Sequence, residues 1–319
     1  MRGSFTLVLC GLLAGLVLPS CTSRRAMTPP PSLHDHHYTS FDGDPFPYRK
    51  WLPKGGNPKM VVVAFHGISG ASDDYENLGR HLQRQGQSVA VYALELRGQG
   101  WDTDVQRRGD IRSPEEWFRD AQTFTTLVKT RHPGARVVWC GESMGSLIAL
   151  HAFNWSDTPP CEALVLASPI VTIPPGRLPA GKRVLFRTFS TFHPTGRVAL
   201  EDLFDEQNTK LTHDTIHQEQ VEQTPWHVPE FSWRLLHHLE RLVRGMSGEA
   251  ARVGVPVLIL HGGKDIFATT ADVSSFPQSF PPATPVRFHI YPDSHHLLFY
   301  DHERARVLKD TERWLLELP

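Results

Sequence analysis

A Gly-Glu-Ser-Met-Gly sequence at residues 141–145 constrains the fold of this chain more than any other segment. Before it, residues 136–140 form an apolar run typical of a buried strand. After it, residues 146–155 are largely apolar and typical of a helix. In so short a turn, backbone segments come close to one another. Glycine tolerates this best because it has no side chain, and Gly141 and Gly145 flank the turn. The segment therefore predicts a strand, a sharp turn and a helix.

The rest of the chain alternates strand and helix patterns in the same way. Short continuous apolar runs are typical of strands buried on both faces of a parallel sheet, and they occur at residues 60–65, 88–94, 163–167, 257–260 and 286–291. Helical patterns occur between and after them, at residues 72–85, 113–131 and 303–318. The alternation predicts an α/β protein with a doubly wound, mostly parallel sheet.

The alternation breaks between residues 170 and 250, where a proline-rich stretch precedes an amphipathic helix that carries Leu235, Leu239 and Val243 on one side. We expect this insertion to be a helical cap over the carboxyl ends of the strands, where open α/β sheets bind ligands. The predicted organisation is a leader, a lead-in, a first part of the core, the cap and a second part of the core, at residues 1–21, 22–58, 59–169, 170–250 and 251–319.

Composition narrows the function classes. Hydrophobic residues make up 40% of the 319 residues and charged residues 21%, which is ordinary for a globular protein. A net charge of −1 offers no basis for electrostatic capture of nucleic acid, so we expect no nucleic-acid partner. The histidine-rich residues 34–37 lack the spacing of a metal site, and we expect a solvated loop there. Cys140 and Cys161 fall at opposite ends of neighbouring strands, which predicts two free, buried thiols.

The first 21 residues have the pattern of an export signal. Arg2 precedes a short apolar stretch at residues 5–18, and polar residues follow Cys21. The end of the stretch resembles a bacterial lipoprotein signal, in which the cysteine is lipidated and becomes the new N-terminus. Pro19 departs from that motif, so ordinary cleavage is the alternative. We expect an exported protein, either periplasmic or anchored to a membrane through Cys21.

Ser143 lies at the tip of the predicted turn, where a hydroxyl is exposed at the edge of the sheet and at a helix N-terminus. The other interpretation is a serine that caps its helix in a glycine-rich turn. A serine hydroxyl is a poor nucleophile until a base takes its proton. In the strand–turn–helix arrangement, an acid and a histidine follow the serine along the chain. Ser143 is therefore the candidate nucleophile.

Candidates for the acid and the base follow two later strands. Asp265 lies in a glycine-containing loop just after residues 257–260, although a turn aspartate capping its own loop would look the same. His295 and His296 are adjacent in the loop after the last strand, and their position alone does not separate them. Asp293 lies in the same loop, but it is so close in sequence to both histidines that its carboxylate would be poorly placed to bind either imidazole.

An oxyanion hole would complete the site. The strand at residues 60–65 ends in His66, Gly67 and Ile68. The backbone N–H groups of Ile68 and Met144 would both point at a developing oxyanion, and each such donor contributes about 2.7–4 kcal/mol in measured cases. We expect His66 and Gly67 to support this loop rather than to carry protons.

These motifs together resemble the monoglyceride lipase, lysophospholipase and serine aminopeptidase S33-like branch of the α/β-hydrolase superfamily. The matching pieces are His66-Gly67, the Leu-Arg-Gly-Gln-Gly sequence at residues 96–100, the serine pentapeptide, the Asp265 loop and the Tyr-Pro-Asp-Ser-His-His sequence at residues 291–296. Residues 211–214 also look like the cap motif of that branch. The family register implies that the catalytic histidine is His296.

The chain departs from the branch at three positions. The branch usually has histidine where this chain has Glu142, a second glycine where it has Ser146, and histidine where it has Gln99. No member of the predicted triad is lost, so the resemblance still implies the chemistry, whereas the identity of the substrate does not carry over with it.

The resemblance implies a serine hydrolase that cleaves a carboxylic ester through an acyl-enzyme intermediate on Ser143, without a metal or an organic cofactor. His296 would act as base and then acid, and Asp265 would orient it. An apolar cap and an N-terminal lipid anchor would suit a monoacylglycerol, a lysophospholipid or a similar single-chain ester.

Three alternatives remain from the sequence. An aminopeptidase-type peptidase could hold a substrate amine with acidic cap residues, which are Glu201, Asp202, Asp205 and Glu206. A binding protein on the same fold would need neither a triad nor an oxyanion hole. Haloperoxidase-like or carbon–carbon bond hydrolase activity would use the same triad.

Overall fold

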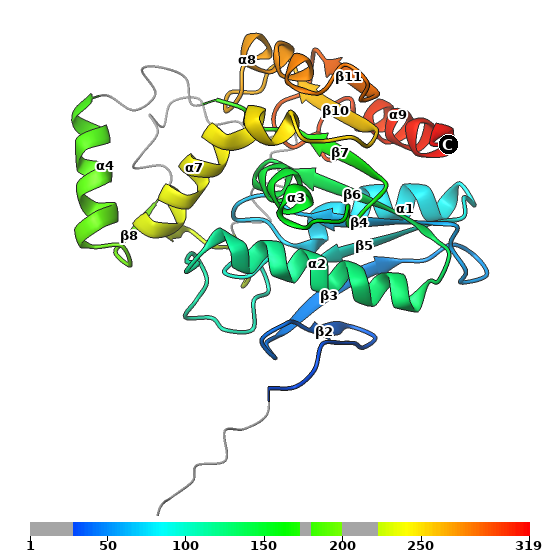
Figure 1. The fold of residues 1–319 in the computed structure, drawn as a ribbon, viewed down its shortest axis with the longest axis horizontal. Helices are drawn as coiled ribbons and strands as arrows, with labels where there is room; N and C mark the ends of the chain where they lie inside the picture. The colour runs from blue at the N-terminus through cyan, green and yellow to red at the C-terminus, as the bar shows by residue number, and fades with distance from the viewer. Residues whose placement is uncertain (1–27, 173–179, 200–222) are drawn as a thin grey trace, which may run out of the picture.

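The computed structural model describes residues 28–172, 180–199 and 223–319. A nine-stranded sheet runs through its centre, in the order β1-β2-β3-β5-β4-β6-β7-β10-β11 (Figure 1). The strands are β1 Ser32–Leu33, β2 His37–Thr39, β3 Pro45–Trp51, β4 Met60–Phe65, β5 Val89–Leu94, β6 Arg136–Glu142, β7 Ala163–Ala167, β10 Val257–Gly262 and β11 Val286–Tyr291. The last six strands in this order, from β5 through β4, β6, β7 and β10 to β11, pair in parallel. This confirms the predicted doubly wound sheet.

Helices cover both faces of the sheet (Figure 1). The helices of the described residues are η1 Ser72–Tyr75, α1 Glu76–Arg84, α2 Pro114–Arg131, α3 Met144–Trp155, α4 Ala180–Phe192, α7 Trp233–Ala250, α8 Thr270–Ser274, η3 Phe276–Ser279 and α9 Arg304–Glu317. Side chains of α2, α3 and α7 form one buried cluster, and those of α1 and α9 form the other. Because successive side chains of a strand point to opposite faces, Val61 and Val63 of β4 join the first cluster and Val62 joins the second.

The segment expected to be a lead-in adds strands to the sheet. β1, β2 and β3 pair antiparallel with one another, and β3 pairs antiparallel with β5. Tyr38 of β2 and Phe46 of β3 are fully buried. Phe46 and Tyr48 alternate with the more exposed Pro47 and Arg49, but the surrounding prolines and histidines hide this period of two. The prolines are tolerated because these strands lie at the edge of the sheet.

The starts of α1 and α7 differ from the prediction in their local structure. The helix expected over residues 72–85 begins as the 3-10 turn η1 and continues as α1, without a side-chain cap between them. In the insertion, α7 begins at Trp233. Ser232 caps this helix, because its side chain accepts a hydrogen bond from the Leu235 N–H. Before this helix, Phe231 lies in the short strand β9 Glu230–Ser232, which pairs with β8 Arg197–Ala199.

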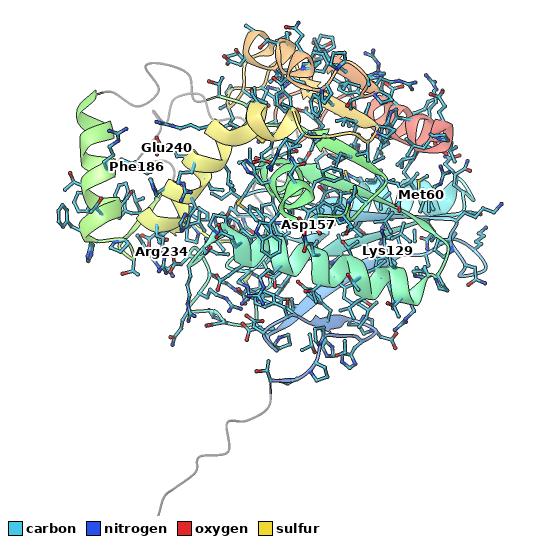
Figure 2. All side chains as sticks on the ribbon, viewed as in Figure 1. Met60, Lys129, Asp157, Phe186, Arg234 and Glu240 are labelled. Carbon is cyan, nitrogen blue, oxygen red and sulfur yellow. The ribbon has the colours of Figure 1, made fainter. Side chains whose placement is uncertain are left out.

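Within the insertion, α4 stands away from the sheet, and α7 lies between it and the core (Figure 1). Phe186 of α4 is buried against α7, with ring centroids 5.9 Å from Trp233 and 6.4 Å from His237 (Figure 2). Of these two helices, α7 contacts the core, where it packs on α3.

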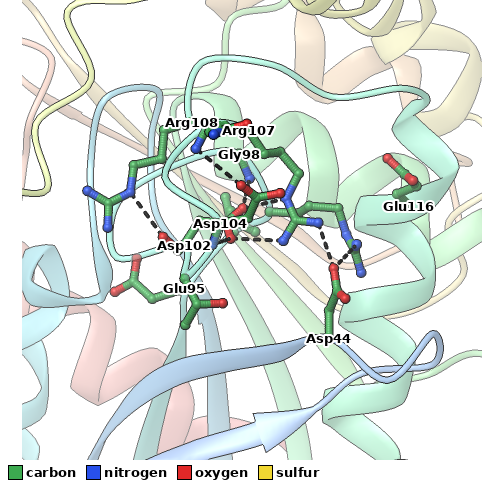
Figure 3. A network of polar contacts seen from close by, with 12 residues as sticks. Asp44, Glu95, Gly98, Asp102, Asp104, Arg107, Arg108 and Glu116 are labelled. Atoms are coloured by element: carbon green, nitrogen blue, oxygen red, sulfur yellow. Dashed lines mark hydrogen bonds and ion pairs between the residues drawn. The ribbon is translucent and has the colours of Figure 1, made fainter. Parts of the chain in front are cut away.

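The loop between β5 and α2 connects the lead-in strands to the insertion. Arg107 donates to Asp102 at 2.8 Å and to Asp44, before β3, at 2.6 Å (Figure 3). Later in the loop, Asp110 accepts a hydrogen bond from the Ser232 hydroxyl at 2.5 Å. These hydrogen bonds tie the segment before β3 and the residue before α7 to the loop that follows β5.

Cys140 and Cys161 are free and buried, as predicted. No helix of the described residues has the length and apolar content to cross a membrane.

Candidate active site

Ser143 occupies a strained turn between β6 and α3. Its backbone has φ 56° and ψ −119°, in a region that residues other than glycine rarely adopt. Its N–H donates to the Ala167 carbonyl at 3.0 Å. A Cβ at Gly141 would collide with the Gly145 carbonyl, and one at Gly145 with the Phe65 carbonyl. Both glycines are therefore required by close packing of backbone against backbone.

Asp265 and His296 form a buried pair. His296 Nδ1 lies 2.8 Å from Asp265 Oδ2, and the other carboxylate oxygen accepts the N–H groups of Phe267 at 2.8 Å and Ala268 at 3.2 Å. Burial alone would raise the pKa of Asp265, but the charge and hydrogen bond of His296 and the two backbone donors lower it below its ordinary value. An ionised Asp265 is suited to hold Nδ1–H and leave Nε2 free to accept a proton.

The neighbouring candidates lie elsewhere. His295 Nδ1 lies 3.0 Å from Asp301, and the His295 N–H also donates to that carboxylate. Asp293 is exposed and forms an ion pair with Lys264 at 3.1 Å. Of the two adjacent histidines, the structure thus places His296 against Asp265.

The end of β7 and the residue after it link the candidate nucleophile to the histidine loop. Ala167 accepts the Ser143 N–H, and the Ser168 hydroxyl donates to the His296 carbonyl at 2.6 Å. Ser168 is buried with φ 45°. Since β6, β7, β10 and β11 are neighbours and parallel, Ser143, Asp265 and His296 all lie at the carboxyl edge of one sheet.

The predicted oxyanion segment lies beside the serine. Phe65 pairs with Gly141, so the loop after β4 emerges next to the turn after β6. A Cβ at Gly67 would lie 3.3 Å from the Ser143 Cβ. Met144 is the first residue of α3, so its N–H faces the open end of that helix. The backbone of Ile68 follows Gly67 in this loop. The arrangement places both predicted segments at Ser143, and the role of their N–H groups stays a prediction.

His66 supports the loop through both ring nitrogens. It is fully buried, its Nδ1 donates to the Gly67 carbonyl at 2.9 Å, and its Nε2 accepts the Leu96 N–H at 3.1 Å. With both nitrogens engaged, this imidazole ties the loop after β4 to the loop after β5. The supporting role expected from the sequence stays a prediction.

Sequence analysis assigned no role to four residues in or near the site. Ser168 holds the His296 backbone, and the Phe267 ring lies 4.9 Å from the His296 ring. Gln99 accepts the N–H of Ser69, in the loop after β4, at 2.9 Å. His261 is buried 4.0 Å from Asp265, and neither of its ring nitrogens has a hydrogen-bond partner. Only the position of these residues just after strands, or at a strand end, could have indicated them.

Within the described residues, no group of three histidine, cysteine, aspartate or glutamate side chains could hold a metal ion. In the histidine-rich segment, the rings of His34 and His37 stack at 4.3 Å. Three predicted features lie outside the described residues. These are Cys21 with the leader, the acidic residues 201–206 and the cap motif at residues 211–214.

Comparison with known proteins gives one family match and several relatives. Residues 56–303 match the family described as serine aminopeptidase, S33. A monoacylglycerol lipase of Mycolicibacterium smegmatis is 24% identical over 88% of this chain and 96% of its own.

Solved structures share the fold. A monoglyceride lipase from Saccharomyces cerevisiae superposes with a TM-score of 0.72 at 20% identity, over 92% of this chain and 97% of its own. A carboxyl esterase from Bacillus coagulans also has a TM-score of 0.72, at 18% identity, over 90% of this chain and 99% of its own.

Proposed function

The chain belongs to the serine aminopeptidase S33 family of hydrolases, and we propose that it is a serine esterase that cleaves a carboxylic ester through an acyl-enzyme intermediate. The observation that carries this proposal is the buried pair of Asp265 and His296, at 2.8 Å, on the same sheet edge as the strained Ser143. Acyl transfer requires a serine on a tight turn, an imidazole to take its proton and an acid hydrogen-bonded to that imidazole to orient it.

In the proposed reaction, His296 Nε2 takes the Ser143 proton as the hydroxyl attacks the ester carbonyl. Asp265 stabilises the imidazolium that forms, and the N–H groups of Ile68 and Met144 stabilise the tetrahedral oxyanion. His296 then protonates the leaving alcohol. A water, deprotonated by the same imidazole, attacks the acyl-serine and releases the acid.

We propose a monoacylglycerol, a lysophospholipid or a similar single-chain ester as the substrate. The lipase names of the relatives support this class. Helix α7 of the insertion packs apolar side chains on α3, the helix that begins directly after Ser143. The aminopeptidase alternative depends on acidic residues 201–206, and the family name alone does not favour it over the lipase relatives.

We further propose that residues 1–21 direct export. The apolar stretch followed by Cys21 is the support for this proposal. Metabolic labelling with a tritiated or clickable fatty acid, with a Cys21→Ala control, distinguishes a lipidated, membrane-anchored chain from one released to the periplasm.

The decisive experiment for catalysis is labelling with a fluorophosphonate probe, which reacts only with an activated serine. We expect the purified protein to be labelled, and both Ser143→Ala and His296→Ala to lose the label. A series of p-nitrophenyl esters of increasing chain length, run beside aminoacyl p-nitroanilides, then separates esterase from peptidase activity. A folded wild-type protein that takes no label would refute the hydrolase proposal.

A further inference from the structure

Glu142 directly precedes the candidate nucleophile, and its side chain is buried inside the protein, with 1% of its surface exposed. Its Oε1 accepts the N–H of Leu298 at 3.1 Å. Leu298 comes two residues after His296. A single side chain thus connects the strand that carries Ser143 to the loop that carries His296.

The histidine loop is held at three points by three different parts of the sheet edge. Asp265, after β10, fixes the imidazole ring, and Ser168, after β7, fixes the His296 carbonyl. Glu142, at the end of β6, fixes the backbone beyond the histidine. The first contact sets the direction of the ring, whereas the other two set where the loop lies relative to the neighbouring strands.

Solvent cannot replace Glu142 as the acceptor for the Leu298 N–H. Its side chain has no exposed surface, and a buried N–H without an acceptor is costly. If Glu142 were replaced by an apolar residue, the loop would have to shift to satisfy that N–H. His296 would move with it, because it lies two residues away.

The surroundings of Glu142 determine its protonation state. The charges of Asp74 of η1 and of Asp265 both disfavour an ionised Glu142 carboxyl. Besides burial, the charge of Glu142 in turn raises the pKa of Tyr75, Cys140 and Tyr300. Burial, followed by the charge of Asp74, raises the pKa of Glu142 to about 8, although the N–H groups of Leu298 and Phe299 act in the opposite direction. A neutral carboxyl still accepts the Leu298 N–H through its oxygen, so Gln can reproduce the contact.

We propose that Glu142 is a positioning residue for the reaction: its oxygen, bound to the Leu298 amide, fixes the His296 loop relative to Ser143. The inference rests on the proposed function, since it assigns a role toward the same triad.

The test compares Glu142→Met, which removes the acceptor, with Glu142→Gln, which keeps it. We expect the Met variant to lose kcat by on the order of 10- to 100-fold, because small displacements of a catalytic group are that costly. KM should change little. Both acylation and deacylation should slow, because His296 serves both steps, and the Gln variant should recover most of the lost rate.

Titration of active serines with the fluorophosphonate probe expresses these rates per folded site, so that partial unfolding is not mistaken for slow chemistry. A matched control is Glu162→Met, because Glu162 also accepts a backbone N–H of β6, that of Val137, at the opposite end of the strand. This control should retain the wild-type kcat per titrated site. If Glu142→Met fails to fold, Glu142→Asp, which retracts the acceptor, takes its place.

Hydrogen exchange of the peptide covering residues 294–300 provides a readout that does not need activity. The Leu298 amide should exchange faster in the Met variant and remain protected in the Gln variant. Equal exchange and equal kcat in wild type and Met variant would overturn the inference, as would a Gln variant as slow as the Met variant. An unlabelled wild-type protein would instead refute the proposed function, and the exchange data would still decide whether Glu142 holds the loop.

Discussion

His296 Nδ1 lies 2.8 Å from Asp265 Oδ2, and the residue beside it, His295, is bound to Asp301 instead. Two adjacent histidines of one loop therefore serve two different acids. Only one of these pairs lies at the sheet edge with Ser143, so the two histidines should differ sharply in their effect on catalysis.

We predict that His296→Gln reduces kcat/KM for a p-nitrophenyl ester by about three to four orders of magnitude, because the base is lost. His295→Gln should reduce it less than about 10-fold. Its effect should appear mainly as a lower melting temperature, because Asp301 loses one partner. Steady-state kinetics of both variants, with thermal melts beside them, check this prediction. A larger kinetic loss for His295→Gln would reverse the assignment.

Gly145 provides a prediction about packing. Gly145→Ala places a Cβ against the Phe65 carbonyl, which is backbone and cannot move away. We expect the variant to be insoluble or to have lost several kcal/mol of unfolding free energy. Gly248→Ala is the control, because Gly248 lies in α7 with open space around it. That variant should gain about 0.5–1 kcal/mol from helix propensity, and urea denaturation measures both changes.

His261 offers a stability test. It is fully buried, and neither ring nitrogen has a partner in the described structure. An unsatisfied buried polar group costs about 1–3 kcal/mol, so His261→Leu should raise the free energy of unfolding by about 1 kcal/mol. His66→Leu, at a comparable buried position where both nitrogens are bound, should lower it. Denaturation of the two variants showing losses of the same size would contradict the explanation.

The pKa of Glu142 predicts a pH dependence of stability. Its ordinary value is 4.5 and its folded value is about 8, so the folded state keeps a proton that the unfolded chain has released. The resulting stabilisation is complete below about pH 4.5 and is lost as pH rises to about 8. Relative to Glu142→Gln, the wild type should lose up to about 1.4 kcal/mol of unfolding free energy per pH unit in this window.

Denaturation curves at pH 5, 6.5 and 8 measure that difference. Burial also raises the pKa of Asp74, to about 7. Asp74 titrates in both proteins, so the difference between their curves measures Glu142 together with its charge interaction with Asp74. Stability curves that run parallel across this pH range would show that Glu142 does not keep its proton.

The core of the fold was predictable because its signals are local. β4 and β7 are continuous apolar runs, and their bounds in the structure match the predicted ones. β3 was not predicted, because its alternation of buried Phe46 and Tyr48 is interrupted by prolines. A strand of that kind is stabilised by its pairing with β5 more than by its own residues.

The sequence by itself determined the order of the six parallel strands along the chain, the tight turn at Ser143 and the loops that hold the candidate acid and base. These follow from hydrophobic period and from glycine, both of which act within a few residues. The resemblance already implied His296 rather than His295, and the tertiary structure places its ring against Asp265. Only the tertiary structure decided that Glu142 and Ser168 hold its loop. The direction of a side chain in a loop depends on contacts with residues far away in the chain, and no local pattern records those contacts.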